Sequence, residues 1–130
     1  MFVIVRDMKS IVVASTNQLW ADAQKNGIYT QSMVGASGDN GEYIHANTPE
    51  QIIPMLNRHY TDYDDILILL VDLDKVISEV KFEASSGPTP GLFPHIYGPL
   101  NIDAIYETLI PRKDASGNFM DSEELLALTS

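Results

Sequence analysis

Residues 91–100 read GLFPHIYGPL, and they give the strongest structural signal in the chain. The middle of this stretch alternates with a period of two, so a β-strand turns His95 and Tyr97 to one side and Ile96 to the other. Glycine and proline limit the strand at both ends. A second stretch, Tyr43-Ile44-His45, has the same arrangement in reverse order. If the two strands lie side by side, their histidine and tyrosine rings meet on one surface.

The composition is that of one acidic domain without cysteine. The 130 residues are enough for a single hydrophobic core. The absence of cysteine excludes disulfides, thiolate metal sites and a cysteine nucleophile. The formal net charge of −10, from 18 acidic and 8 basic residues, argues against nucleic acid as a partner, because the phosphate backbone binds to basic surfaces. A small phosphorylated ligand is compatible with this charge, because a few well-placed donors hold one phosphate.

The apolar runs are too short for targeting or membrane insertion. The first run, residues 1–5, ends before Arg6 and is shorter than the apolar region of a signal peptide. The longest later run spans residues 66–71, whereas a membrane-spanning helix needs about 20 residues. We therefore expect a soluble, cytoplasmic protein with no membrane partner.

Helices alternate with strands only near the start of the chain, and the later part is mostly strands. Capping signals predict two main helices, at about residues 16–26 and 48–60. Runs of β-branched or alternating residues predict strands at residues 2–6, 11–15, 43–45, 66–71, 80–84 and 105–109, and within residues 91–100. This order favours an α+β fold over a doubly wound parallel sheet.

We expect residues 1–112 to form a single globular domain and residues 113–130 to form a C-terminal extension. Residues 111–118 are rich in types that break regular structure. Residues 121–128 have the composition of a short acidic helix or a frayed tail. No pattern in the sequence indicates an oligomeric state.

Five motifs follow one another along the chain: Tyr43-Ile44-His45, Thr48-Pro49-Glu50-Gln51, Arg58-His59-Tyr60, Phe82-Glu83 and residues 92–100. Together they resemble the bacterial family known as domain of unknown function 952. The likeness covers about residues 11–112, and its last motif is nearly continuous over nine residues. The order of the motifs makes the resemblance specific.

The resemblance implies an ADP-ribosyltransferase-like fold, in which a split pair of small mixed or antiparallel sheets holds NAD in a cleft. It also implies that the opening strand, residues 43–45 and the last motif, including Gly98, line this cleft. The family usually has lysine or histidine near the end of the opening strand, where this chain has Val13. That difference removes a ligand-anchoring donor.

Two histidines with tyrosine neighbours are the first candidates for chemistry. Histidine side chains titrate near neutral pH, so His45 and His95 can act as acid, base or phosphate donor. Each also fits the role of a hydrogen-bonded structural residue. Tyr43 and Tyr97 lie on the same strand faces as the histidines, where they can stack on a ligand or hydrogen-bond to it.

Two charged residues complete the candidate site. Glu83 can polarise a ribose hydroxyl or orient His95, as a carboxylate orients a catalytic histidine. As a single glutamate on a strand, it also fits a surface position. Arg58 can hold a phosphate through two N–H groups, or it can form a surface ion pair on its helix.

Metal and other catalytic signatures are weak. A metal site of His45, His95 and Glu83 is not favoured, because their spacing has no local ligand signature. A serine hydrolase is not favoured either, because the chain has no Gly-x-Ser-x-Gly elbow. The sequence contains no Walker loop and no Gly-x-Gly-x-x-Gly run.

Two functions are therefore open. In the first, the protein binds a nucleotide or sugar phosphate of the NAD or ADP-ribose type and transfers or hydrolyses at the ribose. In the second, it is a non-catalytic ligand-binding or interaction module that lacks the anchor at Val13. The residues assigned to chemistry are His95, Tyr97 and Glu83, and those assigned to ligand binding are Tyr43, His45, Arg58 and Gly98. NAD is the cofactor that the resemblance suggests.

Overall fold

The computed structural model describes residues 9–30, 43–84 and 89–129. Within them, the chain has an α+β fold in which every strand pair is antiparallel. One three-stranded sheet has the order β1 (Ser10–Thr16), β4 (Ile66–Asp72), β8 (Ile105–Leu109). A second has the order β3 (Ile44–His45), β6 (Leu92–Tyr97), β5 (Glu79–Ala84). A two-stranded sheet pairs β2 (Ile28–Tyr29) with β7 (Leu100–Asn101).

Three α-helices lie within the described residues: α1 (Asn17–Asn26), α2 (Pro49–His59) and α3 (Glu123–Thr129). Two short 3-10 helices, η1 (Leu73–Lys75) and η2 (Ile102–Ala104), follow β4 and β7. The capping signals operate as the sequence indicates. Thr48 N–H donates to Gln51 Oε1 at 2.9 Å at the start of α2, and Gly27 ends α1 with φ 84°.

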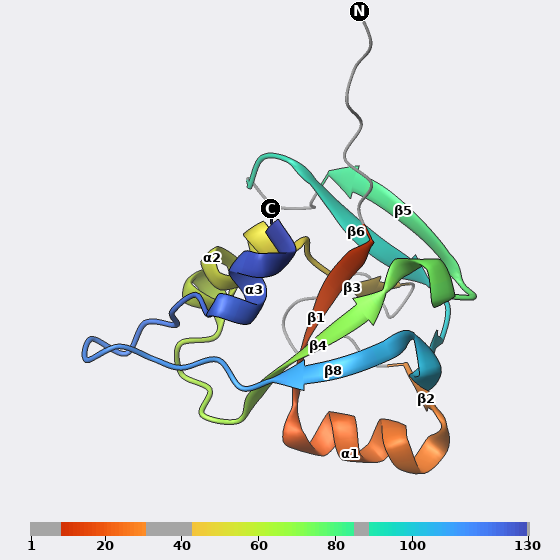
Figure 1. Ribbon diagram of the computed structural model, residues 1–130, viewed down its shortest axis with the longest axis horizontal. Coiled ribbons are helices and arrows are strands. Elements are labelled where there is room, and N and C mark those ends of the chain that lie inside the picture. The colour runs from red at the N-terminus through yellow and green to blue at the C-terminus, as the bar shows by residue number, and fades with distance from the viewer. Residues whose placement is uncertain (1–8, 31–42, 85–88, 130) are drawn as a thin grey trace, which may run out of the picture.

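The first sheet is covered on both faces. Figure 1 places α2 and α3 together on one side of it. On that side lies the first core cluster: Val12, Ala14, Ile52, Ile53, Leu56, Tyr60, Ile66, Ile68, Leu70, Phe119 and Leu125. On the other lies the second core cluster: Ile11, Val13, Ala23, Tyr29, Ile44, Ala46, Leu69, Val71, Ile96, Leu100 and Ala104. The continuous apolar run of β4 is explained by this burial on both faces.

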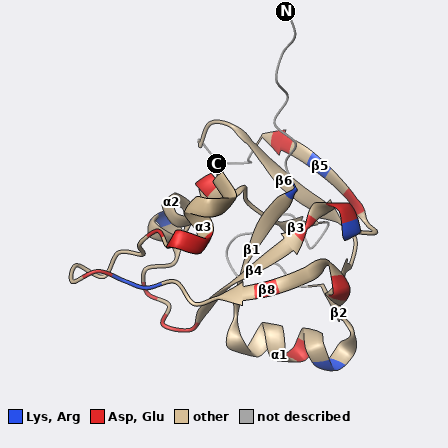
Figure 2. Ribbon diagram, viewed as in Figure 1, with Lys and Arg blue, Asp and Glu red and all other residues tan. Residues whose placement is uncertain are grey.

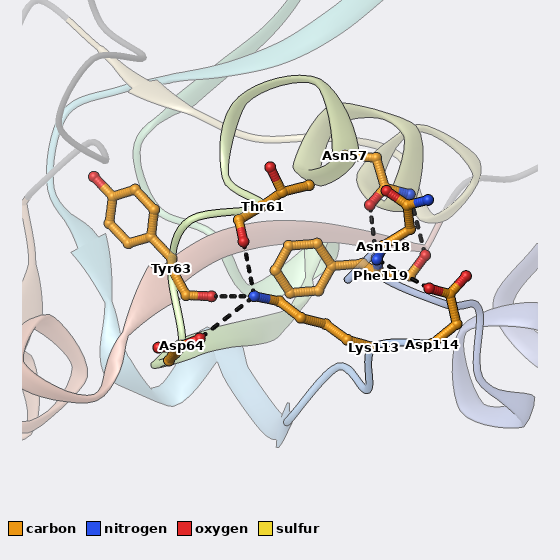
Figure 3. Close-up of polar contacts among 8 residues, drawn as sticks. All are labelled: Asn57, Thr61, Tyr63, Asp64, Lys113, Asp114, Asn118 and Phe119. Carbon is orange, nitrogen blue, oxygen red and sulfur yellow. Dashed lines mark hydrogen bonds and ion pairs between the residues drawn. The ribbon is translucent and has the colours of Figure 1, made fainter. Parts of the chain in front are cut away.

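The segment after residue 112 is fastened to α2 and to the connection that follows it. Lys113 Nζ donates to the carbonyl oxygens of Thr61 and Tyr63, each at 2.8 Å (Figure 3). Asn57 Nδ2 donates to Phe119 O at 3.1 Å, and Phe119 N–H donates to Asn57 Oδ1 at 2.6 Å. We call Lys113 and Asn57, with these partners, the C-terminal clamp. It positions Phe119, and α3 then adds Leu125 to the first core cluster.

Most predicted elements are present, and one prediction needs correction. The strand predicted for residues 2–6 lies outside the described residues. The polar, glycine-containing composition of residues 28–41 predicts a loop, and most of this segment also lies outside the described residues. The correction concerns that loop, because Ile28–Tyr29 at its start form β2 and Tyr29 is buried. Of the two alternatives for residues 121–128, the short acidic helix is present as α3, in addition to the two main helices.

Candidate functional site

The site begins with the pairing of β3 and β6. Ile44 lies opposite Ile96, and His45 lies opposite His95. Both isoleucines are buried in the second core cluster. Because side chains alternate across a sheet, the neighbouring histidines and tyrosines lie on the opposite face. The predicted meeting of the four rings is thus confirmed.

These rings are in direct contact. Tyr43 stacks on His95, with ring centroids 4.1 Å apart and an interplanar angle of 20°. The Tyr43 centroid is 4.8 Å from that of His45 and 5.2 Å from that of Tyr97. The two histidine centroids are 5.4 Å apart, edge to face. We call Tyr43, His45, His95, Tyr97 and the carboxylate of Glu83 the ring cluster.

Glu83 joins the ring cluster from β5. Its Oε1 accepts a hydrogen bond from Tyr97 Oη at 2.5 Å and pairs with His95 Nδ1 at 2.8 Å. The hydrogen bond from Tyr97, followed by that from His95, holds the pKa of the Glu83 carboxyl below its ordinary value. Glu83 is therefore ionised at neutral pH and acts as a hydrogen-bond acceptor. The orienting role predicted for it toward His95 matches this geometry.

The members of the ring cluster differ in exposure. His95 is buried, with 3% of its side chain exposed, whereas 37% of the Glu83 side chain is exposed. Tyr43, His45 and Tyr97 are partly exposed. Both bonds to Glu83 end on Oε1, and no hydrogen bond or ion pair within the described residues ends on Oε2. A ligand therefore has access to Glu83 and three rings, with His95 behind them.

One neighbour was not among the predicted site residues. Lys81 lies opposite His95 in the β5–β6 pairing, and its Nζ is 4.9 Å from the centroid of the Tyr97 ring. Nearly half of its side chain is exposed, and its contact with Glu79 at 4.0 Å is long for an ion pair. The sequence does indicate this position for Lys81, because the alternation of residues 80–84 puts Lys81 on the same strand face as Glu83.

Two predicted ligand-binding residues, Arg58 and Gly98, are not members of the ring cluster. Arg58 lies on α2, the helix whose start contacts β6. Gln51 Nε2, in the first turn of α2, donates to Leu92 O at the start of β6. Arg58 is exposed in the last turn of α2, seven residues and about 10 Å further along the helix axis. The ligand-binding role of Arg58 stays a prediction.

Gly98 directly follows Tyr97, and the backbone explains the glycine. Its φ is 140°, and a Cβ at this position would lie 2.6 Å from Ser78 Oγ. Ser78 Oγ donates to Pro99 O at 2.7 Å, next in the chain. Glycine is required here so that the chain passes close to the start of β5.

Val13 is not at the ring cluster. It lies opposite Leu69 in the first sheet, is 1% exposed and packs in the second core cluster with Ile44 and Ile96. The expectation that Val13 marks a missing ligand anchor is corrected accordingly. A histidine in its place would put an imidazole into the core rather than beside a ligand.

Two further properties concern the described residues alone. Nowhere in residues 9–30, 43–84 and 89–129 do three histidine, aspartate or glutamate side chains group closely enough to hold a metal ion. No helix in these ranges has the length and apolar character needed to cross a membrane.

The fold and the ring cluster define a small antiparallel α+β protein with a partly exposed histidine, tyrosine and carboxylate site. The family described as protein of unknown function DUF952 matches residues 14–108, and the chain belongs to this family. A search among curated proteins found no match.

Solved structures share the fold. The crystal structure of protein CC0527 from Caulobacter crescentus has a TM-score of 0.76 and 23% identity, over 90% of this chain and 98% of that one. The solution NMR structure of CC0527 has a TM-score of 0.69 and 24% identity, over 84% and 90% of the two chains. At these identities the likeness concerns the fold.

Proposed function

We propose that this protein is a cytoplasmic binding protein for a nucleotide or sugar phosphate of the NAD or ADP-ribose type, and that the ring cluster is its site. One observation carries the proposal: two histidines and two tyrosines gather on one sheet face around a carboxylate that contacts His95 and Tyr97 through one oxygen. Aromatic faces stack on bases and on the nicotinamide ring, and a carboxylate accepts hydrogen bonds from ribose hydroxyls. The ADP-ribosyltransferase-like fold, implied by the resemblance, belongs to this proposal.

Each side chain has a proposed role that follows from its exposure. Tyr43 and Tyr97 stack on or hydrogen-bond the ligand, and His45 donates to its phosphate or ribose. Glu83 accepts from a ribose hydroxyl through Oε2. His95 is buried and acts on the ligand through Glu83, with which it pairs at 2.8 Å.

If the site is catalytic, the proposed reaction breaks the N-glycosidic bond of NAD. Nicotinamide leaves with the bonding electron pair, and the oxygen of water or of an acceptor forms the new bond to the ribose carbon. The proton of that nucleophile passes to an imidazole. The ionised state of Glu83 suits an acceptor of hydrogen bonds and excludes it as the general acid at neutral pH.

NMR titration tests the binding. The protein has three histidines, so imidazole signals of His45 and His95 can be followed with His59 as an internal reference, since His59 is exposed on α2. NAD and ADP-ribose should shift the His45 and His95 signals and leave His59 unchanged. Pyrophosphate has phosphate groups but no rings, so signals that it shifts report contacts with phosphate alone. Unmoved His45 and His95 signals with all three compounds would end the nucleotide proposal.

A matched pair of substitutions locates the binding on Glu83. Glu83→Gln removes the charge of the ring cluster, whereas Glu79→Gln makes the same change four residues away on the same strand, where the side chain is 69% exposed. We expect Glu83→Gln to weaken ADP-ribose binding by about tenfold, the effect of one lost charge-assisted hydrogen bond. Glu79→Gln should bind as the parent does.

The non-catalytic module is the second candidate, and the burial of His95, with 3% of its side chain exposed, favours it. Release of nicotinamide from NAD, measured by chromatography, separates the two candidates. Binding without release supports the module, and release that Glu83→Gln abolishes supports the enzyme.

A further inference from the structure

We propose that β5 is an interface strand that pairs with β5 of a second copy of this chain. β5 lies at the edge of its sheet, because the order is β3-β6-β5. Among the described residues β6 is the one strand that pairs with it. Figure 1 places β5 at the outer border of the molecule. An edge strand has a row of backbone donors and acceptors that another strand can use.

The position of Pro94 identifies which backbone groups point outward. Phe82 lies opposite Pro94 in the ladder with β6. Opposed residues of an antiparallel pair exchange either two hydrogen bonds or none, and proline has no N–H to donate. Pro94 O accepts from Ala46 N–H at 3.0 Å, on the side of β3. The N–H and C=O groups of Phe82 therefore point to the open edge.

The backbone N–H and C=O groups of Val80 and Ala84 also point to the open edge. In an antiparallel strand the backbone groups of every second residue point to the same side, so those of Val80 and Ala84 point outward as those of Phe82 do. A second strand that pairs antiparallel with Phe82 opposite Phe82 aligns Val80 with Ala84. All three residues then exchange hydrogen bonds with the second copy. This register uses residues 80–84, nearly the whole strand.

The charges of β5 select this register. Glu79, Lys81 and Glu83 alternate in sign along one face, as the red, blue and red segments of β5 show in Figure 2. With Phe82 on the two-fold axis, Lys81 of each copy lies opposite Glu83 of the other. A register centred on Lys81 would put lysine opposite lysine, and one centred on Glu83 would put carboxylate opposite carboxylate. Like charges directly opposite each other destabilise a pair of strands.

Apolar surface lies on the reverse face at the same place. The exposed fractions are 40% for Phe82 and 57% for Leu92, which follows Gly91 at the start of β6. With Phe82 on the axis, the two phenyl rings become cross-strand neighbours, with Cβ atoms about 5 Å apart. The edge thus offers a second copy hydrogen bonds, opposite charges and an apolar contact.

The pairing also changes the surroundings of the ring cluster. Lys81 of the second copy comes beside the Glu83 carboxylate, whose Oε2 makes no hydrogen bond or ion pair within the described residues. The dimer forms independently of any ligand, so the proposal stands or falls without the proposed function.

Amide hydrogen exchange at several concentrations gives a direct test. The amides of Val80, Phe82 and Ala84 should exchange more slowly as the concentration rises from about 20 μM to about 1 mM, because mass action favours the dimer. The amides of Lys81 and Glu83 point to β6 and should be protected at every concentration. Sedimentation should give a dissociation constant on the order of 100 μM, since a single pair of strands is a small interface. Exchange of the three outward amides that is independent of concentration, fast or slow, overturns the proposal.

Two substitutions separate the pairing from other associations. Phe82→Pro removes an outward N–H that β6 does not use, and edge strands accept proline there. It should weaken the dimer at least about tenfold, while Phe82→Val, which keeps the N–H, should retain concentration-dependent protection. Lys81→Glu puts three glutamates in a row and should weaken the dimer to a similar degree. A dimer that persists in both Phe82→Pro and Lys81→Glu contradicts the assignment to β5.

Discussion

The ring cluster and the C-terminal clamp are both partly buried polar clusters, and they differ in what their polar groups contact. Lys113 and Asn57 make their short hydrogen bonds to the backbone of Thr61, Tyr63 and Phe119. The ring cluster instead joins side chain to side chain, with Glu83 and three rings partly exposed. A polar group bonded to backbone fixes the path of the chain. A polar group bonded to other side chains does not fix the path of the chain, and it can exchange such a bond for one with a ligand.

The largest effect should follow a break in the clamp at Asn57. Asn57→Ala leaves the N–H and C=O of the buried Phe119 without partners. We expect the free energy of unfolding to fall by about 2–3 kcal/mol, since each unsatisfied buried group costs about 1–3 kcal/mol. Urea denaturation measures the change.

Asn118→Ala is the matched control, because Asn118 is exposed and its contacts with Asp114 come from backbone atoms. This control should change the stability by less than about 0.5 kcal/mol. Equal losses in the two variants would mean that the amide of Asn57 does not hold Phe119 in place.

Removal of the Lys113 ammonium should have the next largest effect. Lys113→Met keeps the apolar stem but leaves the carbonyl oxygens of Thr61 and Tyr63 without this donor. We expect a loss of about 1–2 kcal/mol in the free energy of unfolding. Lys25→Met, on the exposed end of α1, is the control and should be nearly neutral. The imidazole signals of His45 and His95 should be the same in both variants, because the clamp does not position the ring cluster.

The two clusters also differ in how far the sequence reveals them. The ring cluster follows from alternation with a period of two, because this pattern puts Tyr43 with His45 and His95 with Tyr97. The same alternation, within residues 80–84, makes Glu83 a candidate site residue. Its hydrogen bond with Tyr97 is not predictable in this way, because the two residues are not opposite each other in the β5–β6 ladder. Lys113 gives no such signal, since its partners are carbonyl oxygens brought together only by the tertiary fold.

The errors have the same physical origin. Val13 and Val12 look alike in sequence, and only the packing of two sheets puts Val13 in the second core cluster. The ligand-binding role of Arg58 rests on residue type alone and stays a prediction, and the fold places this residue in the last turn of α2. The α+β class was predictable from the order of elements, and the antiparallel register was not.

A smaller and pH-dependent effect is expected at the ring cluster. Tyr97→Phe removes the strongest cause of the low pKa of Glu83, so that pKa should rise toward its ordinary value. A lowered folded-state pKa stabilises the protein above the unfolded-state pKa, and this contribution is lost as pH falls through the folded-state pKa. The parent should therefore exceed the variant in stability at pH 7, and the difference should shrink below about pH 4.

Carboxyl NMR titration and denaturation at two pH values measure this effect. Tyr106→Phe is the control, because Tyr106 contacts Ser10 on the first sheet. A Glu83 pKa that Tyr97→Phe leaves unchanged would contradict the hydrogen bond from Tyr97.

The smallest effect should come from Asp64, and it separates two explanations of the clamp. Lys113 Nζ lies 3.5 Å from Asp64 Oδ1 but 2.8 Å from each carbonyl oxygen, and the Asp64 side chain is 98% exposed. An ion pair in water contributes little, because solvent screens it. Asp64→Asn should therefore change the free energy of unfolding by less than about 0.5 kcal/mol, at low and at high salt. A loss comparable to that of Lys113→Met would make the clamp an ion pair rather than a cap on backbone carbonyls. The clamp would then depend on charge, as the ring cluster does, and the contrast between the two would be lost.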